Sequence, residues 1–384
     1  MTCPHCHRAA KFHEYREKGV TCLMGPIRLQ RAYYYCAHCQ RGVIPWDETL
    51  GFHRHAFSPG AEEVVSLAGC VESFGQARDR LLSRMAGLHC SESTIQRTTE
   101  DAGERLGKLL DTQQTLGPDE PWEFFQDTAG DHVGYISLDA TGVPQQGEHG
   151  GPAEGRMPYV GMLYNPPPAD WQGKRPEWQA RYVCGLTTLD DLGLVMRRQA
   201  DQVGFDQVER WIGLSDGGNG LEEFLRKNFP LPKLQLILDF YHASEHVNDF
   251  VKLYCPDEEQ ARQTGQEWCH KLKHEGGAAF VKLLEELPLP SRRKGLREAR
   301  VALLGYLRNN VHRMDYPTYQ KQGWHIGSGP IESACKTVVN RRLCGGGMRW
   351  RERGTDAVCH LRALYRSEQS QWSAFWNPVN ATAN

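Results

Sequence analysis

The sequence has no apolar run that approaches the roughly 18 residues of a membrane-spanning helix. Its first residues, Met-Thr-Cys-Pro-His-Cys, have neither the basic start nor the apolar centre of a secretory signal peptide. There is no internal repeat and no long low-complexity tract. These absences predict a cytosolic globular protein, so the 13 cysteines are expected to be thiols and metal ligands rather than disulfides.

A strong charge of either sign is also missing, because the net charge is only −2. The charges are nevertheless unevenly distributed. Residues 117–216 hold sixteen acidic and seven basic side chains, and residues 291–353 hold fourteen basic and four acidic ones. An acidic middle followed by a basic end suits a metal site that faces a polyanion. Two solvated surfaces of opposite sign would produce the same distribution.

Two C-x-x-C pairs stand near the N-terminus, Cys3 with Cys6 and Cys36 with Cys39. Each pair lets a tight turn aim two thiolates at one ion, and four thiolates make a closed tetrahedral zinc site. Residues 27–35 alternate like a strand that leads into the second pair, which predicts a zinc ribbon that depends on zinc to fold. Redox pairs or free thiols are the alternative. Further residues that offer a substitute ligand are Cys22, His5, His7 and His38.

Residues 58–113 are helical in pattern, and Ser58-Pro59 marks the start of one helix. A glycine-containing turn at 87–90 is followed by Ser91 and a helix that carries Thr94, Gln96 and Arg97. This arrangement is similar to the second half of a helix-turn-helix, in which those three side chains would contact DNA. A plain helical connector fits the same pattern.

An α/β region follows, with a strand that ends at Asp139 and another that ends just before Asp216. The first three strands suggest an antiparallel meander, and the later alternation of helix and strand predicts parallel strands with crossovers. The expected strands are 133–142, 159–164, 181–187, 211–215 and 234–239, with helices near 201–211 and at 221–227. Glycines 217, 218 and 220 beside Asp216 would let a backbone approach closely.

Glu332 lies at the predicted start of a late helix, with Gly329 as N-cap and Pro330 in the first turn. An isolated glutamate there is often only a charge that favours the helix dipole. The element order is that of a ribonuclease-H-like fold, in which the first and fourth strands are neighbours and a late helix brings a third carboxylate beside them. Asp139, Asp216 and Glu332 would then form a cluster that binds Mg²⁺ or Mn²⁺. Two such ions, roughly 4 Å apart, suit phosphodiester chemistry.

Four sequence blocks resemble the DDE transposases of bacterial insertion sequences, most closely the Kra-type group related to Mutator-like elements. They are Ser137-Leu-Asp139-Ala-Thr-Gly, Leu214-Ser-Asp216-Gly-Gly-Asn-Gly-Leu221, Leu238-Asp239-Phe-Tyr-His242 and Gly323-Trp-His-Ile-Gly-Ser-Gly-Pro-Ile-Glu332. The Arg341-Arg342-Leu and Gly347-Met-Arg-Trp350 motifs extend the similarity, which covers nearly the whole chain.

The resemblance implies that Asp139, Asp216 and Glu332 are the catalytic, metal-binding triad. Asp239 and His242 match a signature near that site, although a structural role for the histidine is an alternative. The implied partners are double-stranded DNA, as transposon terminal repeats and target, and further copies of the chain in a homodimer or larger assembly on DNA. The basic residues expected to hold phosphates are Lys336, Arg341, Arg342 and Arg349. Trp268 would stack on a flipped base, or lie in a core.

The expected organisation is a zinc ribbon at 1–50, a helical DNA-binding region at 51–115, a catalytic domain at 130–255 and 321–366 with an all-helical insertion at 256–320, and a tail at 367–384. The expected function is cleavage of insertion-sequence ends and joining of the 3′-OH ends to target DNA, in the bacterial cytoplasm at the nucleoid. The alternatives are a domesticated DNA-binding protein without cleavage and a ribonuclease-H-like nuclease without strand transfer.

Overall fold

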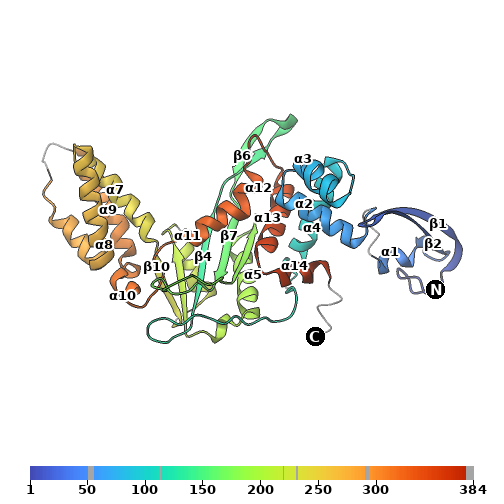
Figure 1. The fold of residues 1–384 in the computed structure, drawn as a ribbon, viewed down its shortest axis with the longest axis horizontal. Coiled ribbons are helices and arrows are strands. Elements are labelled where there is room, and N and C mark those ends of the chain that lie inside the picture. The colour runs from blue at the N-terminus through green and yellow to red at the C-terminus, as the bar shows by residue number, and fades with distance from the viewer. Residues whose placement is uncertain (51–55, 113, 219, 231, 290–293, 378–384) are drawn as a thin grey trace.

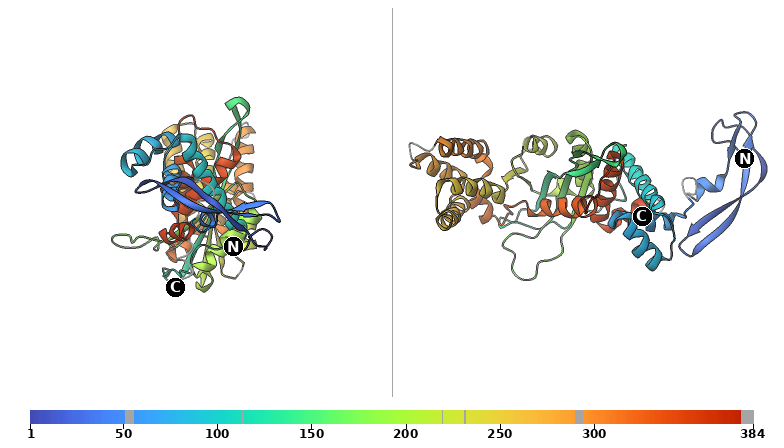
Figure 2. Two further views of the ribbon diagram at one scale, coloured as in Figure 1. Left: turned by 90° about the vertical axis from the view of Figure 1, so that its right-hand side faces the viewer. Right: turned by 90° about the horizontal axis from the view of Figure 1, so that it is seen from above.

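The computed structural model describes residues 1–50, 56–112, 114–218, 220–230, 232–289 and 294–377. The parts follow one another along a long axis, with the N-terminal strands at one end, a sheet in the middle and a group of helices at the other end (Figure 1, Figure 2). Parts of four expected regions lie outside the described residues, namely 51–55, 113, 219, 231, 290–293 and 378–384.

The N-terminal part is an antiparallel sheet in the order β1-β2-β3. Its elements are β1 (Lys11–Cys22), β2 (Gly25–Cys36), β3 (Arg41–Val43) and the short helix α1 (Pro45–Thr49). The strand expected at 27–35 is confirmed within β2. The partner strand β1 was not predicted, because charged residues on both of its faces hide the alternation that marks a half-buried strand.

Helices follow, as expected: α2 (Pro59–Val71), α3 (Phe74–Gln76), the π-helical segment η1 (Ala77–Ala86) and α4 (Glu92–Asp111). Ser58 caps α2 by accepting from the Ala61 N–H at 3.3 Å, and Ser91 caps α4 by accepting from the Thr94 N–H at 3.2 Å. These side chains satisfy N–H groups that a helix start leaves without partners, so both helices begin where the sequence predicts.

The central sheet has five strands in the order β10-β9-β4-β7-β8. They are β4 (Val133–Ala140), β7 (Tyr159–Tyr164), β8 (Ala180–Gly185), β9 (Arg210–Ser215) and β10 (Leu234–Leu238). The first three form the predicted antiparallel meander, and β9 and β10 run parallel to β4, also as predicted. A small hairpin of β5 (Val143–Gln146), η2 (Glu148–Gly150) and β6 (Pro152–Arg156) was not predicted.

Apolar side chains alternate between the two faces of this sheet, so both faces are covered. Ile136 and Leu163 pack with α5 (Leu189–Gln202) and α6 (Leu221–Asn228), whereas Tyr135 and Met162 belong to the larger core on the other face. The helix expected near 201–211 is wrong. Thr188 caps α5 much earlier, and Gly204, with φ of 74°, ends it before η3 (Phe205–Gln207) and β9.

The far end of the molecule is helical, as expected, and its elements are α7 (Phe240–Tyr254), α8 (Glu258–Glu286), α9 (Lys294–Asn310), η4 (Val311–Arg313) and α10 (Tyr316–Lys321) (Figure 1). Trp268 of α8 is 9% exposed and packs against Phe250, Tyr254 and Phe280, so it is a core residue and not a surface for a base. None of the helices in the described ranges combines the length and apolar composition needed to cross a bilayer.

The chain then returns to the sheet through α11 (Gly329–Ala334), the π-helical segment η5 (Cys335–Asn340), α12 (Arg341–Leu343) and α13 (Glu352–Arg366). The expected tail instead contains a packed helix, α14 (Gln369–Trp376). Its Trp372, Phe375 and Trp376 are buried in a core shared with α2, α4 and α13. Local pattern could not predict this, because so short a helix is held by contacts to distant segments.

Candidate active site and metal centre

Four cysteine side chains converge at one end of the N-terminal hairpin. Cys3 Sγ lies 3.6 Å from Cys39 Sγ, and Cys6 Sγ lies 3.5 Å from Cys36 Sγ. All four sulfur atoms lie within 4.8 Å of one another. Thiolates bound to one zinc ion at about 2.3 Å each would have this spacing, so the donor set fits a tetrahedral metal ion.

The two C-x-x-C turns share a backbone conformation, since the residues that follow them, His7 and Gln40, have φ of 55° and 54°. Hydrogen bonds from the backbone N–H groups of Cys39 and His38 lower the pKa of Cys36 to about 6. A lowered pKa favours the thiolate, which is the form that binds metal. Within the described part of the chain, the possible substitute ligands do not belong to this group: Cys22, His5, His7 and His38.

Asp139 and Asp216 stand at the same edge of the central sheet. The parallel strands β4 and β9 pair up to Ser137 and Leu214. Asp139 lies two residues further along β4, and Asp216 lies directly beyond the end of β9. Neighbouring strands are about 4.8 Å apart, so this register brings the two side chains together. Both residues are half-buried.

Glu332 reaches this edge from α11, which contacts β4 and β7. The N-cap is Ser328, one residue before the predicted Gly329, and Pro330 lies in the first turn as expected. Glu332 itself is exposed. At the start of η5, directly after α11, Cys335 Sγ donates to Asp139 Oδ2 at 3.5 Å, which ties this segment to the end of β4.

The three carboxylates act on one another electrostatically. Burial raises the pKa of Asp139, and the negative charges of Asp216 and Glu332 raise it further. Their oxygen atoms are less tightly gathered than the four thiols, which are the single group of three or more ligand side chains within 4.8 Å in the described residues. The arrangement is therefore an open acidic edge, whose mutual repulsion a cation would relieve.

Asp239 is 2% exposed, and each oxygen of its carboxylate accepts a hydrogen bond from another residue of the chain. Its Oδ1 accepts from the Tyr241 N–H at 2.9 Å, which caps α7, and its Oδ2 accepts from Ser328 Oγ at 2.6 Å. Ser328 Oγ also lies 3.2 Å from Glu332 Oε1. Asp239 therefore joins the start of α7 to the start of α11 and positions the helix that carries Glu332.

His242 lies on α7, one turn before His246, and their Nε2 atoms are 3.3 Å apart. Its Nδ1 lies 3.7 Å from Glu245 Oε2. Both imidazoles face the Tyr306 ring, and Tyr306 Oη donates to the Asp216 carbonyl at 3.5 Å. Among the described residues, no hydrogen bond joins His242 to the three carboxylates, and its connection to Asp216 runs through Tyr306.

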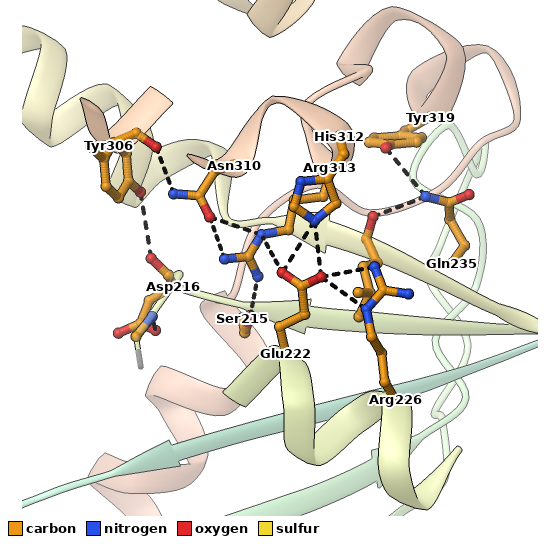
Figure 3. Close-up of polar contacts among 12 residues, drawn as sticks. Ser215, Asp216, Glu222, Arg226, Gln235, Tyr306, Asn310, His312, Arg313 and Tyr319 are labelled. Carbon is orange, nitrogen blue, oxygen red and sulfur yellow. Dashed lines mark hydrogen bonds and ion pairs between the residues drawn. The ribbon is translucent and has the colours of Figure 1, made fainter. Parts of the chain in front are cut away.

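A buried arginine, which the sequence did not single out, supports the strand end before Asp216 (Figure 3). Arg313 is 3% exposed and donates to Ser215 Oγ and Asn310 Oδ1, each at 3.0 Å. Its Nε also lies 3.7 Å from Glu222 Oε2. No local pattern could have revealed it, because Arg313 and Ser215 are about 100 residues apart.

The prediction that Arg342 holds a DNA phosphate is wrong. Its side chain is 2% exposed, and its Nε donates to the Gly69 carbonyl at 2.8 Å. The guanidinium packs against the rings of Phe74 and Trp350. Helical spacing could not separate this buried arginine from its exposed neighbour Arg341.

The remaining predicted DNA contacts lie on different elements of the fold. Lys336 and Arg349 are exposed. Lys336 Nζ lies 3.8 Å from Glu332 Oε2, and Arg349 Nη1 donates to the Gly150 carbonyl at 3.1 Å. On α4, Gln96 and Arg97 are exposed, whereas the hydroxyl of Thr94 lies 2.9 Å from that of the capping Ser91.

No protein-family model matches this chain, and no curated protein matches it either.

Proposed function

We propose that this protein is a DDE-type DNA transposase that cleaves insertion-sequence ends and joins their 3′-OH ends to target DNA. The observation that carries the proposal is the meeting of β4, β9 and α11, which puts Asp139 beside Asp216 with Glu332 close enough to raise the pKa of Asp139. The strand order β10-β9-β4-β7-β8, with β7 antiparallel to β4, supports a ribonuclease-H-like catalytic domain. The helices within 256–320 would be its insertion.

Asp139, Asp216 and Glu332 would hold two Mg²⁺ or Mn²⁺ ions, because hard cations prefer carboxylate oxygens. When bound, such ions activate an attacking hydroxyl and stabilise the leaving oxygen of a phosphodiester. The protein's own contribution is orientation. Cys335 donates to Asp139, and Ser328 lies within hydrogen-bond distance of Glu332, so both carboxylates are held from the same helix.

Double-stranded DNA would lie along the exposed basic residues that continue this helix, Lys336 and Arg341, with Arg349 beyond them. The four-cysteine cluster would hold structural zinc, and the N-terminal ribbon and α4 would contact the terminal repeats. We further propose a homodimer or larger assembly on DNA, in the bacterial cytoplasm.

The test uses the full chain with Mg²⁺ or Mn²⁺ and two labelled duplexes. One duplex carries the DNA upstream of the coding sequence and the other carries the DNA downstream, where the ends of the element would lie. Asp139→Asn, Asp216→Asn and Glu332→Gln should each lower cleavage by at least about a hundredfold, since each removes a ligand that acts on the reacting phosphate. Glu267→Gln, an exposed acid on α8, is the matched control and should cut normally. DNA binding should change little in all four variants.

Cleavage that persists in all three triad variants would overturn the proposal. The alternatives separate in the same experiment. A nuclease would cut but fail to join pre-cleaved ends to a target plasmid, and a DNA-binding protein without cleavage would protect the ends from digestion and leave them intact in Mn²⁺.

A further inference from the structure

A cavity of 780 Å³ lies between the N-terminal helices and the sheet domain. Its walls come from α3, α4, the end of β5 and residues 348–354. The three carboxylates of the candidate active site do not line it. The volume is that of a small-molecule site, roughly 300–1,000 Å³, so one nucleotide fits and a duplex does not.

A buried guanidinium with an unused donor lines this cavity. Arg342 packs between Phe74 and Trp350, with 4.6 and 4.8 Å from its Cζ atom to the ring centroids. Its Nη2 atom is buried and has no hydrogen-bond partner among the described residues. An unpaired buried donor is costly, and the positive charge of this guanidinium makes the cavity that it lines more favourable to an anion.

Further arginines make the cavity suited to an anion. Arg349 and Arg351 are exposed at its edge, and the Arg351 side chain has no hydrogen bond or ion pair with any residue that the structure describes. Arg353, by contrast, is engaged by Asp101 and Glu104. Arg349 and Arg351 are thus the exposed cations that can meet a phosphate.

Other residues that line the cavity offer groups that match the edge of a nucleobase. Gln96 and Glu100 come from α4, with Gln96 Nε2 donating to Glu100 Oε1 at 2.8 Å, and Gln146 comes from the end of β5. An amide presents donors and an acceptor, and a carboxylate accepts from an exocyclic amino group. The charge of Glu92, also in this wall, is offset by Arg78 at 2.5 Å.

We propose that this cavity binds one unpaired nucleotide, with its base against Gln96 and Glu100 and its phosphate on Arg349 and Arg351. The nucleotide would come from a single-stranded stretch of DNA or from free mononucleotide, which share this chemistry. Nucleotide binding in this cavity rests on the proposed function in one respect only, namely that the bound strand is transposon DNA.

The test measures binding of the full chain to a labelled duplex with a single-stranded overhang and to the matching blunt duplex, by fluorescence anisotropy in buffer without Mg²⁺ or Mn²⁺. Arg351→Ala should weaken overhang binding about tenfold while changing blunt binding much less. Arg197→Ala is the control, because Arg197 is an exposed arginine of α5 whose side chain likewise has no partner among the described residues. Gln96→Ala should change the preference among overhang bases.

Equal losses in Arg351→Ala and Arg197→Ala, or no preference of the unmodified chain for the overhang, would overturn the proposal. Displacement of the overhang by dAMP would support the cavity and show that free nucleotide also enters it. If dAMP does not displace the overhang while Arg351→Ala and Gln96→Ala still have the expected effects, the bound nucleotide comes from the DNA strand. Since Mg²⁺ and Mn²⁺ are left out, these results do not depend on cleavage, whereas the triad variants test cleavage alone.

Discussion

Arg313→Met tests whether the buried arginine behind Asp216 holds this end of the sheet together. Methionine keeps the apolar length of the side chain and removes the guanidinium. Two acceptors lose a donor, Ser215 Oγ and Asn310 Oδ1, each now at 3.0 Å from an Arg313 nitrogen. Glu222 loses a weaker contact at 3.7 Å. The structure therefore predicts damage from unpaired acceptors rather than from a cavity.

The expected cost follows from these contacts. A buried polar group left without its partner costs about 1–3 kcal/mol. Arg313→Met leaves two such groups but also removes the cost of burying a charge, so we expect a net loss of about 2–4 kcal/mol. Burial lowers the pKa of Arg313, which shows that desolvation opposes its charge. Arg226→Met is the matched control, because Arg226 pairs with the same Glu222 at 2.8 Å from an exposed position. It should cost only about 0.3–0.5 kcal/mol.

Urea denaturation of both variants and the unmodified chain, followed by circular dichroism, measures these differences in the free energy of unfolding. Cleavage should also fall in Arg313→Met, since Ser215 precedes Asp216. The reasoning is refuted if both variants cost the same. It is equally refuted if Arg313→Met is neutral or stabilising, because desolvation would then outweigh the hydrogen bonds.

Three other variants test separate parts of the fold. Cys36→Ser should abolish bound zinc, measured by mass spectrometry, and leave the N-terminal hairpin sensitive to protease, whereas Cys22→Ser should retain the metal. Without added Mg²⁺ or Mn²⁺, Asp139→Asn should be more stable than the unmodified chain at pH 8 and no different at pH 3. The pKa of Asp139 is higher in the folded chain than in the unfolded chain, so its ionisation destabilises the folded state as the pH rises through these two values. The asparagine side chain does not titrate, so the variant escapes this loss. Trp372→Ala should cost about 3–5 kcal/mol in thermal unfolding, because the side chain is 8% exposed in a shared core.

Several features were predictable because their causes lie within a few residues of one another. The two C-x-x-C turns place pairs of thiols locally, and Ser58 and Ser91 cap the helices they precede. The strands β4, β7, β9 and β10 show in runs of β-forming residues between turns, and the order of the elements was enough to predict that β4 and β9 are neighbours. Asp139 and Asp216 follow from that order.

Other features required the tertiary structure. Arg342 and Arg341 are adjacent and chemically identical, and only the packing of Phe74 and Trp350 decides that one is buried. Arg313 and Asp239 acquire their partners from segments about 90 residues away or more. Local patterns encode caps, turns and alternation, because those depend on near neighbours. Burial of a charge depends on which distant surfaces meet, and that is decided only when the whole chain packs.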